Sequence, residues 1–511
     1  MIFLKKTFPF LLLAFMLSVV LRLPQLGRPL SKHHEFCTAV SLRILQNWWD
    51  EGIEKFNYLP ATNFAKDADK FINNFGNATG SVVDAAGNYY YISHPPLAYY
   101  VPYAFFKIID VRPDVIPLQL FNMLLHFLSA VFVYFIVCLL SFNRARSHLH
   151  VPSFVAFLFY LFAPATLWFQ GNVYMSDMAV QLPFVIGVYV VLKMIIRQKF
   201  YVPKYIFFYS LVLFSMIYTS WLGVFFAIAV IVYSLLHTRA SKGFSMLILL
   251  TIGVLFLTLR LIIYQYSSIA GLSALLTESI DRYLVRGSLG NLQDGFFGFV
   301  GSYLFFLKNL IYNYLLNYFF FYLIIAGFIG FVFSRHKLKI TFSENGYRFM
   351  WLSVLPIGLL HLLFLNYSEH DFTVLYASLF FSVLCGIFYD KIKKSAAVSN
   401  QRLNLVFGIS LLLLIIHFTI SNMPGPKNYK GERYDTDKLK GEYIAQQAKV
   451  DEVVFMLEKP EPQLLFYAQR NIKVINDANQ AMTFLQQRKI ASGRIFSLNN
   501  GSISSQYILN E

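Results

Sequence analysis

Charged side chains are scarce in this chain: they make up 14% of its 511 residues, whereas a soluble domain carries about 25%. Cysteine is scarcer still. Cys37, Cys138 and Cys385 lie far apart, which excludes a disulfide framework and a cysteine-based metal motif. Hydrophobic residues reach 57% and aromatic residues 18%. This composition predicts a polytopic membrane protein.

Acidic residues are fewer than basic ones, and the formal net charge is +16. In a soluble protein this balance would suggest a nucleic-acid partner. Here the basic residues lie in short loops between apolar runs, where they act as orientation signals. The sequence therefore predicts a membrane partner and no nucleic acid.

Apolar runs long enough to cross a bilayer occur at about eleven places. They lie at 7–23, 115–141, 151–169, 177–196, 204–219, 221–237, 243–265, 310–334, 347–366, 372–390 and 403–421. Two further segments, 35–50 and 95–110, have the pattern of helices that lie in the membrane interface. We therefore expect an all-α polytopic membrane protein with additional interfacial helices.

Lysine and arginine are missing from two short loops, 171–176 and 366–371, but frequent in the loops that alternate with them. Cytoplasmic loops carry the positive charge, so the N-terminus is expected in the cytoplasm. An odd number of spans then places the C-terminus outside. The long loop 24–114, the loop 266–309 and the tail 422–511 are expected to share the outer face.

The composition changes after Pro424. The segments 453–457, 472–475, 494–498 and 506–509 have the pattern of strands. Helical segments at 462–470 and 478–489 lie between the first three strands. These patterns predict a small soluble α/β domain at 422–511, which follows a membrane domain at 1–421.

Acidic residues occur at the outer ends of three predicted spans: Glu35, Asp177 and the segment 369–371. A single ionisable residue at such a boundary is usually only hydrated. Three clusters on one face, beside a long loop, favour a functional site. His33 and His34 precede Glu35, but neighbouring residues on a chain rarely face one metal ion, so the sequence assigns no metal ligand.

Several of these segments together resemble the GT-C glycosyltransferases. The branch with the greatest similarity contains the protein O-mannosyltransferases of glycosyltransferase family 39 and the lipid A aminoarabinose transferases. The matching positions are His34-Glu35, Ala39, Arg43, His94-Pro95-Pro96-Leu97, Ser176-Asp177 and Glu369-His370-Asp371. The branch has an aspartate where this chain has His34.

The resemblance implies a GT-C fold and transfer of a hexosyl or pentosyl group from a polyprenyl-phosphate donor. The acceptor would be a glycan, a lipid or a protein on the periplasmic face of a bacterial inner membrane. Either Glu35 or Asp177 would be the catalytic base. The residues expected to contact substrate are His33, His34, Arg43, Tyr91, His94, Arg282, Arg286, Glu369, His370 and Asp371.

Other functions stay open at this point. A transporter or flippase of lipid-linked sugars would place charges within its spans or show inverted repeats, and neither is visible here. A catalytically degenerate GT-C scaffold is compatible with His34 in the place of an aspartate. The sequence also leaves open the sugar, the acceptor and whether a divalent cation is the cofactor.

Overall fold

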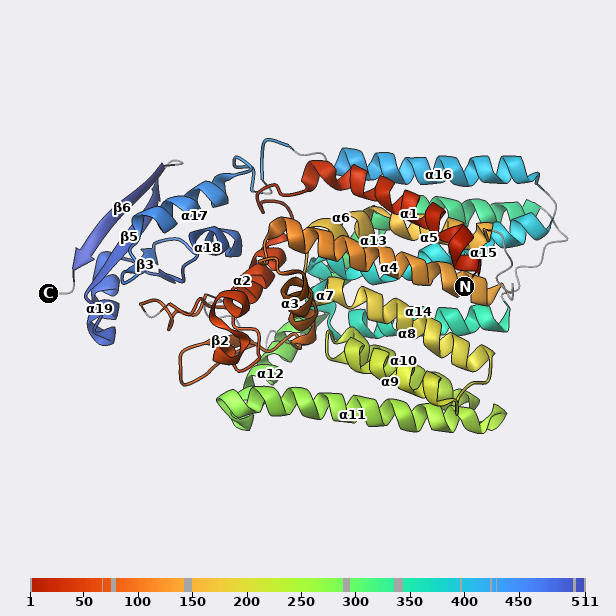
Figure 1. Cartoon of the computed structure of the whole chain (residues 1–511), viewed down its shortest axis with the longest axis horizontal. Coiled ribbons are helices and arrows are strands. Elements are labelled where there is room, and N and C mark those ends of the chain that lie inside the picture. The colour runs from red at the N-terminus through yellow and green to blue at the C-terminus, as the bar shows by residue number, and fades with distance from the viewer. Residues whose placement is uncertain are drawn as a thin grey trace.

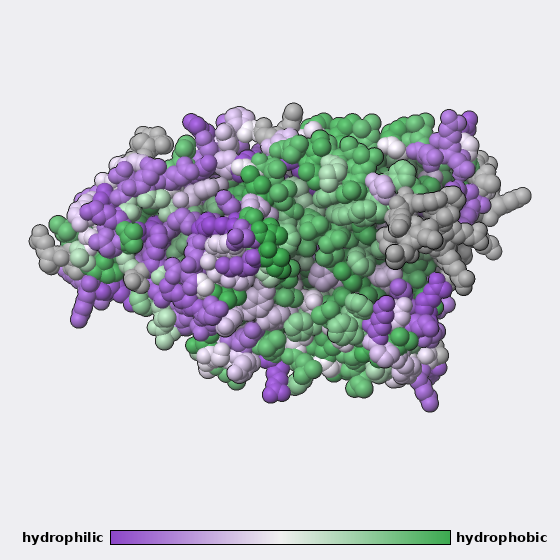
Figure 2. All heavy atoms as spheres, viewed as in Figure 1, coloured by the Kyte–Doolittle hydropathy of each residue, from purple (hydrophilic) through white to green (hydrophobic). Residues whose placement is uncertain are grey.

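The computed structural model describes residues 2–66, 68–74, 80–141, 149–287, 295–334, 343–395, 398–422, 425–428, 430–499 and 502–509. The molecule is elongated, with a bundle of long helices at one end and a small sheet at the other (Figure 1). On the face that Figure 2 shows, a hydrophobic belt covers the bundle and hydrophilic residues gather at both ends. Such a belt is what a membrane-spanning bundle requires.

Eight helices among the described residues are long and apolar enough to cross a membrane. They are Thr7–Gln25 (α1, Ile2–Arg22, with its extension), α4 (Val115–Leu140), Ser176–Ile196 (α7, Ser176–Ala179, and α8, Gln181–Ile196), α11 (Lys242–Ala270), α13 (Gly295–Ser334), α14 (Glu344–Leu363), Asp371–Lys394 (η6, Asp371–Ala377, and α15, Ser378–Lys394) and α16 (Asn400–Ser421). Helices α5 (Val151–Leu161) and α6 (Pro164–Asn172), which meet at a bend of 56°, form a ninth span if the pair is counted as one.

Each predicted apolar run falls on a helix, which confirms the all-α polytopic fold. The number of long spans is smaller than the predicted eleven or so. The segments 204–219 and 221–237 form the shorter helices α9 (Pro203–Ile217) and α10 (Leu222–His237), of 15 and 16 residues. They pack against each other and against α11, so the two short runs complete the bundle wall (Figure 1).

The first outer loop contains two helices, α2 (Glu35–Glu51) and α3 (Leu97–Ile109). Between them lies a hairpin of β1 (Ser81–Val83) and β2 (Tyr89–Tyr91). The sequence predicts α2 as an interfacial helix, but most of its side chains are buried, Arg43 among them. The reason is that α2 packs against α3, α4 and the C-terminal helix α18, which together cover its polar face as well.

The C-terminal part is an α/β unit, as predicted. Its elements are α17 (Thr436–Gln447), β3 (Val453–Met456), α18 (Pro462–Ala468), β4 (Ile472–Val474), α19 (Ala478–Arg488), β5 (Ser492–Asn499) and β6 (Ser502–Leu509). The strand order is β4-β3-β5-β6, in which β3 is parallel to both of its neighbours and β6 runs antiparallel to β5. The domain boundary at 421/422 stays a prediction.

This C-terminal unit is tied to the first outer loop by buried polar contacts. The Arg470 guanidinium lies 2.9 Å from the Asp69 carboxylate, and both side chains are almost fully buried. The Asn471 side chain donates to the carbonyl of Phe64 at 2.9 Å, and the hydroxyl of Tyr467 accepts from the Leu30 amide at 2.8 Å. The outer loop and the tail therefore form one packed layer over the end of the bundle.

Candidate functional site

A cavity of about 270 Å³ lies where this outer layer meets the helix bundle. Its lining comes from segments far apart in the sequence: the loop before α3, the helices α7, α10, α12 (Leu272–Arg286) and α14, and the turn η5 (Leu365–Glu369). The residues with polar groups that line it are Ser93, His94, Asp177, Ser220, Trp221, Ser279, Arg282, Tyr283, Arg286 and Tyr367. Apolar residues from the ends of α10 and α14 complete the wall.

Asp177 is the only acidic residue among the described residues that line this cavity. It is buried, with 1% of its surface exposed. The hydroxyl of Tyr376 donates to Oδ1 at 2.5 Å, and the hydroxyl of Tyr367 donates to Oδ2 at 2.9 Å. Ser176 adds a longer contact to Oδ2 at 3.3 Å. These hydroxyl groups fix the orientation of the carboxylate without bringing a positive charge to it.

His94 lies beside Asp177 and is joined to it through Ser176, whose Oγ is 2.6 Å from His94 Nδ1. Its Nε2 is buried and has no hydrogen-bond partner among the described residues. Burial lowers the pKa of His94 to about 4, so the imidazole is uncharged at neutral pH. His94 therefore offers the cavity a neutral hydrogen-bonding group.

Two arginines enter the cavity from α12, where Arg282 and Arg286 are four residues apart on one face. Arg282 Nη2 donates to the Tyr91 hydroxyl at 2.7 Å, and Arg286 Nη2 approaches the same oxygen at 3.4 Å. The Arg286 guanidinium also lies 4.1 Å from the centre of the Tyr367 ring. Burial raises the pKa of Tyr91, but the two arginines outweigh it and the net shift is downward.

Neither arginine forms an ion pair with a carboxylate among the described residues. Among the described residues, no carboxylate therefore lies at ion-pair distance from either positive charge. Guanidinium groups in this state match the charge and the geometry of a phosphate group.

Glu35 lies outside the cavity-lining set. Its carboxylate forms a buried ion pair with Arg28. The backbone amides of Ser31 and Lys32 donate to its Oε2 at 2.8 and 2.7 Å. These contacts close the turn that precedes α2. Glu35 therefore does not line a cavity with Asp177, because local backbone donors and Arg28 hold its carboxylate in that turn.

Arg43, Glu369 and His370 also lie outside the cavity-lining set, although all three are predicted site residues. Arg43 is buried 5.9 Å from the Phe64 ring, and Glu369 is exposed. The His370 ring stacks on Phe372 at 5.1 Å. Burial lowers the pKa of His370 to about 3, so at neutral pH it carries no charge with which to meet a phosphate.

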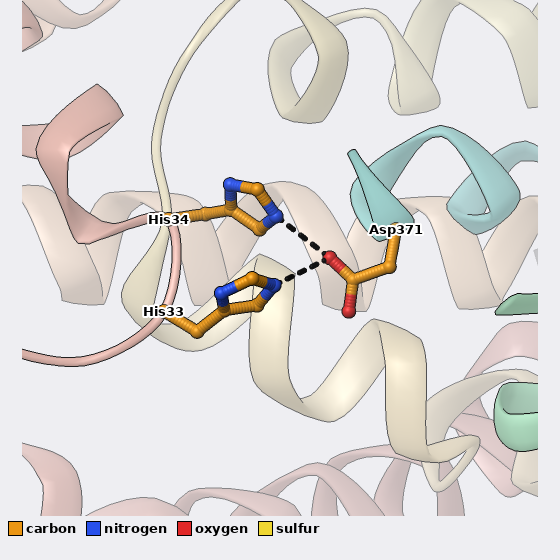
Figure 3. Close-up of side chains that lie close together, drawn as sticks. All are labelled: His33, His34 and Asp371. Carbon is orange, nitrogen blue, oxygen red and sulfur yellow. Dashed lines mark hydrogen bonds and ion pairs between the residues drawn. The ribbon is translucent and has the colours of Figure 1, made fainter. Parts of the chain in front are cut away.

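His33, His34 and Asp371 form a separate cluster (Figure 3). The Nε2 atoms of His33 and His34 lie 3.0 and 2.8 Å from Asp371 Oδ1. All three ligand atoms lie within 4.8 Å of one another, so these residues could hold a divalent cation. Among the described residues this is the only such group of at least three histidine, cysteine or acidic side chains.

The structure also brings to the site Tyr376, which the sequence analysis does not single out, and the break at 219–223 between two predicted spans. Tyr376 holds Asp177, and Ser220 and Trp221 line the cavity. Tyr376 lies within a predicted span, where an aromatic residue is expected only to pack. No local pattern distinguishes it, because its partner Asp177 is 199 residues away in the chain.

No protein-family model and no curated protein sequence matches this chain. Solved structures do match it. ArnT from Cupriavidus metallidurans bound to undecaprenyl phosphate has 11% identity and a TM-score of 0.58, with 96% of this chain and 93% of that chain covered. The archaeal oligosaccharyltransferase AglB from Archaeoglobus fulgidus, in complex with an inhibitory peptide and a dolichol-phosphate, has 10% identity and a TM-score of 0.57, with 95% and 69% covered.

The Archaeoglobus fulgidus oligosaccharyltransferase also matches as a complex with Zn and sulfate, at 11% identity and a TM-score of 0.58, with 95% and 67% of the two chains covered. At this level of identity the likeness concerns the fold. It extends over nearly the whole of this chain, outer loop and C-terminal unit included.

Proposed function

We propose that this chain, which has the GT-C fold of membrane glycosyltransferases, moves a sugar from a polyprenyl-phosphate donor to an acceptor hydroxyl on the outer face of the membrane. One observation carries the proposal: a single cavity joins the carboxylate of Asp177 to the guanidinium groups of Arg282 and Arg286. Sugar transfer from a lipid phosphate needs both a base and a cationic site for the leaving phosphate.

In this reaction Asp177 accepts the proton of the acceptor hydroxyl as the hydroxyl oxygen attacks the anomeric carbon. The bond between that carbon and the phosphate oxygen breaks, and the electron pair leaves with the lipid phosphate. Arg282 and Arg286 stabilise the negative charge that develops there. Tyr367 and Tyr376 hold the base, because both donate to its carboxylate.

His94 orients the substrate in this scheme. Its Nε2 has no hydrogen-bond partner among the described residues, so it can form a hydrogen bond to a hydroxyl group of the sugar or the acceptor. Trp221 and Phe364 line the cavity near the ends of α10 and α14, where the first isoprene units of a lipid would lie. Undecaprenyl phosphate and dolichol-phosphate in the two similar structures support a ligand of this chemistry.

We further propose that the sugar is a hexosyl or pentosyl group and that the acceptor is a glycan, a lipid or a protein. The cavity would face the periplasm of a bacterial inner membrane, with the N-terminus in the cytoplasm. The proposed reaction uses no divalent cation in the cavity. The residues that could hold such an ion, His33, His34 and Asp371, lie outside it.

The test uses the full chain in nanodiscs, a panel of undecaprenyl-phosphate sugars, and membrane extracts as acceptors. Release of undecaprenyl phosphate is followed by mass spectrometry. The Asp177→Asn variant should be slower by about 10²–10⁴-fold, because it loses a general base, while its binding of undecaprenyl phosphate should persist. Arg282→Gln combined with Arg286→Gln should weaken that binding.

Asp390→Asn is the matched control, because Asp390 lies near the far end of α15 and pairs with Lys394. It should change neither rate nor binding. A wild-type rate in Asp177→Asn, or a wild-type chain that does not bind undecaprenyl phosphate, would contradict the proposed function.

A further inference from the structure

The three side chains in Figure 3 have an unusual arrangement, because two of them are neighbours in the chain. His34 has a φ of +62°, in the left-handed region, and lies immediately before the first residue of α2. This conformation is uncommon for a residue other than glycine. It brings the His33 and His34 rings to a centroid distance of 3.7 Å, and both Nε2 atoms face the same oxygen of Asp371.

Hydrogen bonds among the described residues satisfy only part of this cluster. His33 Nε2 forms a hydrogen bond with Asp371 Oδ1 at 3.0 Å, and His34 Nε2 lies 2.8 Å from the same oxygen, at ion-pair distance. Among the described residues, both ring nitrogens of His34 are buried without a hydrogen-bond partner. Buried polar atoms without partners are costly and call for an explanation. A cation between the two imidazoles and the carboxylate would satisfy Nε2 and Oδ1 together.

The surroundings also suit a bound ion. The rings of Phe169 and Phe372 lie 6.3 and 5.0 Å from the His34 ring and exclude water from one side of the cluster. On the other side, His33 and Asp371 line a second cavity of about 260 Å³. An ion held here would keep a coordination position open to that cavity.

We propose that His33, His34 and Asp371 bind a divalent cation of the zinc class, at a site separate from the cavity around Asp177. Two imidazole nitrogens and one carboxylate oxygen are a ligand set that Zn²⁺ accepts, whereas Mg²⁺ and Ca²⁺ prefer oxygen ligands throughout. Ligand distances of about 2.0–2.2 Å to zinc are compatible with three ligand atoms that lie this close together.

The ion would connect the first outer loop to the segment that holds Asp177. Asp371 begins η6, which ends at Ala377 and includes Tyr376, and it follows the turn that contains Tyr367. Both tyrosines donate to Asp177. A cation at Asp371 would therefore stiffen the part of the chain that positions this carboxylate. Ion binding itself does not depend on the proposed sugar transfer.

The experiment measures metal content and metal-dependent stability of the full-length protein in detergent. After removal of metal with a chelator, Zn²⁺ or Co²⁺ is added, free metal is removed, and bound metal is measured by mass spectrometry. Wild type should retain a stoichiometric ion, and Co²⁺ should give the visible absorption of a site with nitrogen ligands. His34→Ala and Asp371→Asn should lose both signals.

The His33→Gln variant is included because it should fold normally. The His33 side chain is 56% exposed, so its replacement leaves no cavity in the core. Zn²⁺ should raise the unfolding temperature of wild type but not of His33→Gln. His237→Ala, on α10, is the control and should behave as wild type. The inference is overturned if wild type retains no ion, or if the ion survives in His34→Ala and Asp371→Asn.

Discussion

Glu35 and Asp177 are both buried carboxylates, yet their neighbours give them different chemistry. Glu35 faces the Arg28 guanidinium and two backbone amides. The Asp177 carboxylate accepts hydrogen bonds from the hydroxyl groups of Tyr367 and Tyr376 and lines an open cavity. A carboxylate paired to a guanidinium is held by strong charge-assisted hydrogen bonds, whereas the carboxylate of Asp177 also faces the space of the cavity. At the residue scale the hydrogen-bond partners, more than the type of residue, separate an anchor from a candidate base.

We predict that Glu35→Gln destabilises the fold without stopping the transfer. The change should cost about 1–3 kcal/mol, because it leaves the buried Arg28 without its counter-ion. Thermal unfolding in detergent measures the loss, and the transfer rate per folded molecule should stay near that of wild type. Glu51→Gln, in an exposed ion pair with Lys55, should cost at most about 0.5 kcal/mol. A stable Glu35→Gln variant with no transfer would make Glu35 the base after all.

At the scale of elements, the break between α9 and α10 shapes one wall of the cavity. The chain turns at Thr219 and Ser220, and Gly223 follows in the first turn of α10. A Cβ at Gly223 would lie 2.4 Å from the backbone nitrogen of Ile217. Only glycine allows α10 to start this close to the end of α9. The same close approach places Ser220 and Trp221 on the cavity.

Gly223→Ala should therefore push the two helices apart and destabilise the bundle by about 1–3 kcal/mol, as overpacking does. It should also weaken the binding of undecaprenyl phosphate, because Trp221 moves with the start of α10. The measurements are thermal unfolding and native mass spectrometry. Gly253→Ala, in α11, is the matched control, because a Cβ there meets no atom within 4 Å. Equal stability of the two variants would show that the turn accommodates a Cβ atom at position 223, which would contradict this prediction.

On the scale of the whole molecule, the first outer loop and the C-terminal unit lie at one end of the bundle, and the N-terminus lies at the other (Figure 1). Ser93 and His94 of that outer loop line the cavity. The C-terminal unit packs against the first outer loop, because the buried ion pair of Asp69 and Arg470 connects the two. One end of the molecule therefore holds the loop, the tail and the cavity together. If the charge pattern orients the bundle as expected, that whole end faces the periplasm.

We predict that single cysteines label according to this orientation in intact cells. Ala86→Cys, in the β1–β2 turn, and Gln506→Cys, in β6, should react with a membrane-impermeant maleimide from outside. Tyr201→Cys and Asn400→Cys, at the other end of the bundle, should react only after the membrane is permeabilised. The native cysteines are buried or half-buried, so their background should be low. Labelling of Ala86→Cys and Asn400→Cys from the same side would contradict the topology.

The sequence by itself determined the helices of the bundle, because a segment inside a bilayer must satisfy its own backbone and therefore forms a helix wherever an apolar run is long enough. It also determined the strands of the C-terminal unit and the helices α18 and α19, whose patterns are local. It did not predict helix α17. Its motifs marked Asp177 and His94, and both line one cavity. Arg282 and Arg286 were predicted as site residues because they lie in an outer loop, and they line the same cavity.

Only the tertiary structure decided which of these residues meet. The ion pair with Arg28 holds Glu35 outside the cavity that Asp177 lines. Tyr376 donates to Asp177 although the two residues are 199 positions apart in the sequence. His33 and His34 face one oxygen of Asp371 because His34 adopts a left-handed conformation that no composition or periodicity predicts. The physical reason is common to all three cases. Backbone hydrogen bonding and hydrophobic periodicity are properties of one segment, whereas the partner of a side chain depends on how distant segments pack.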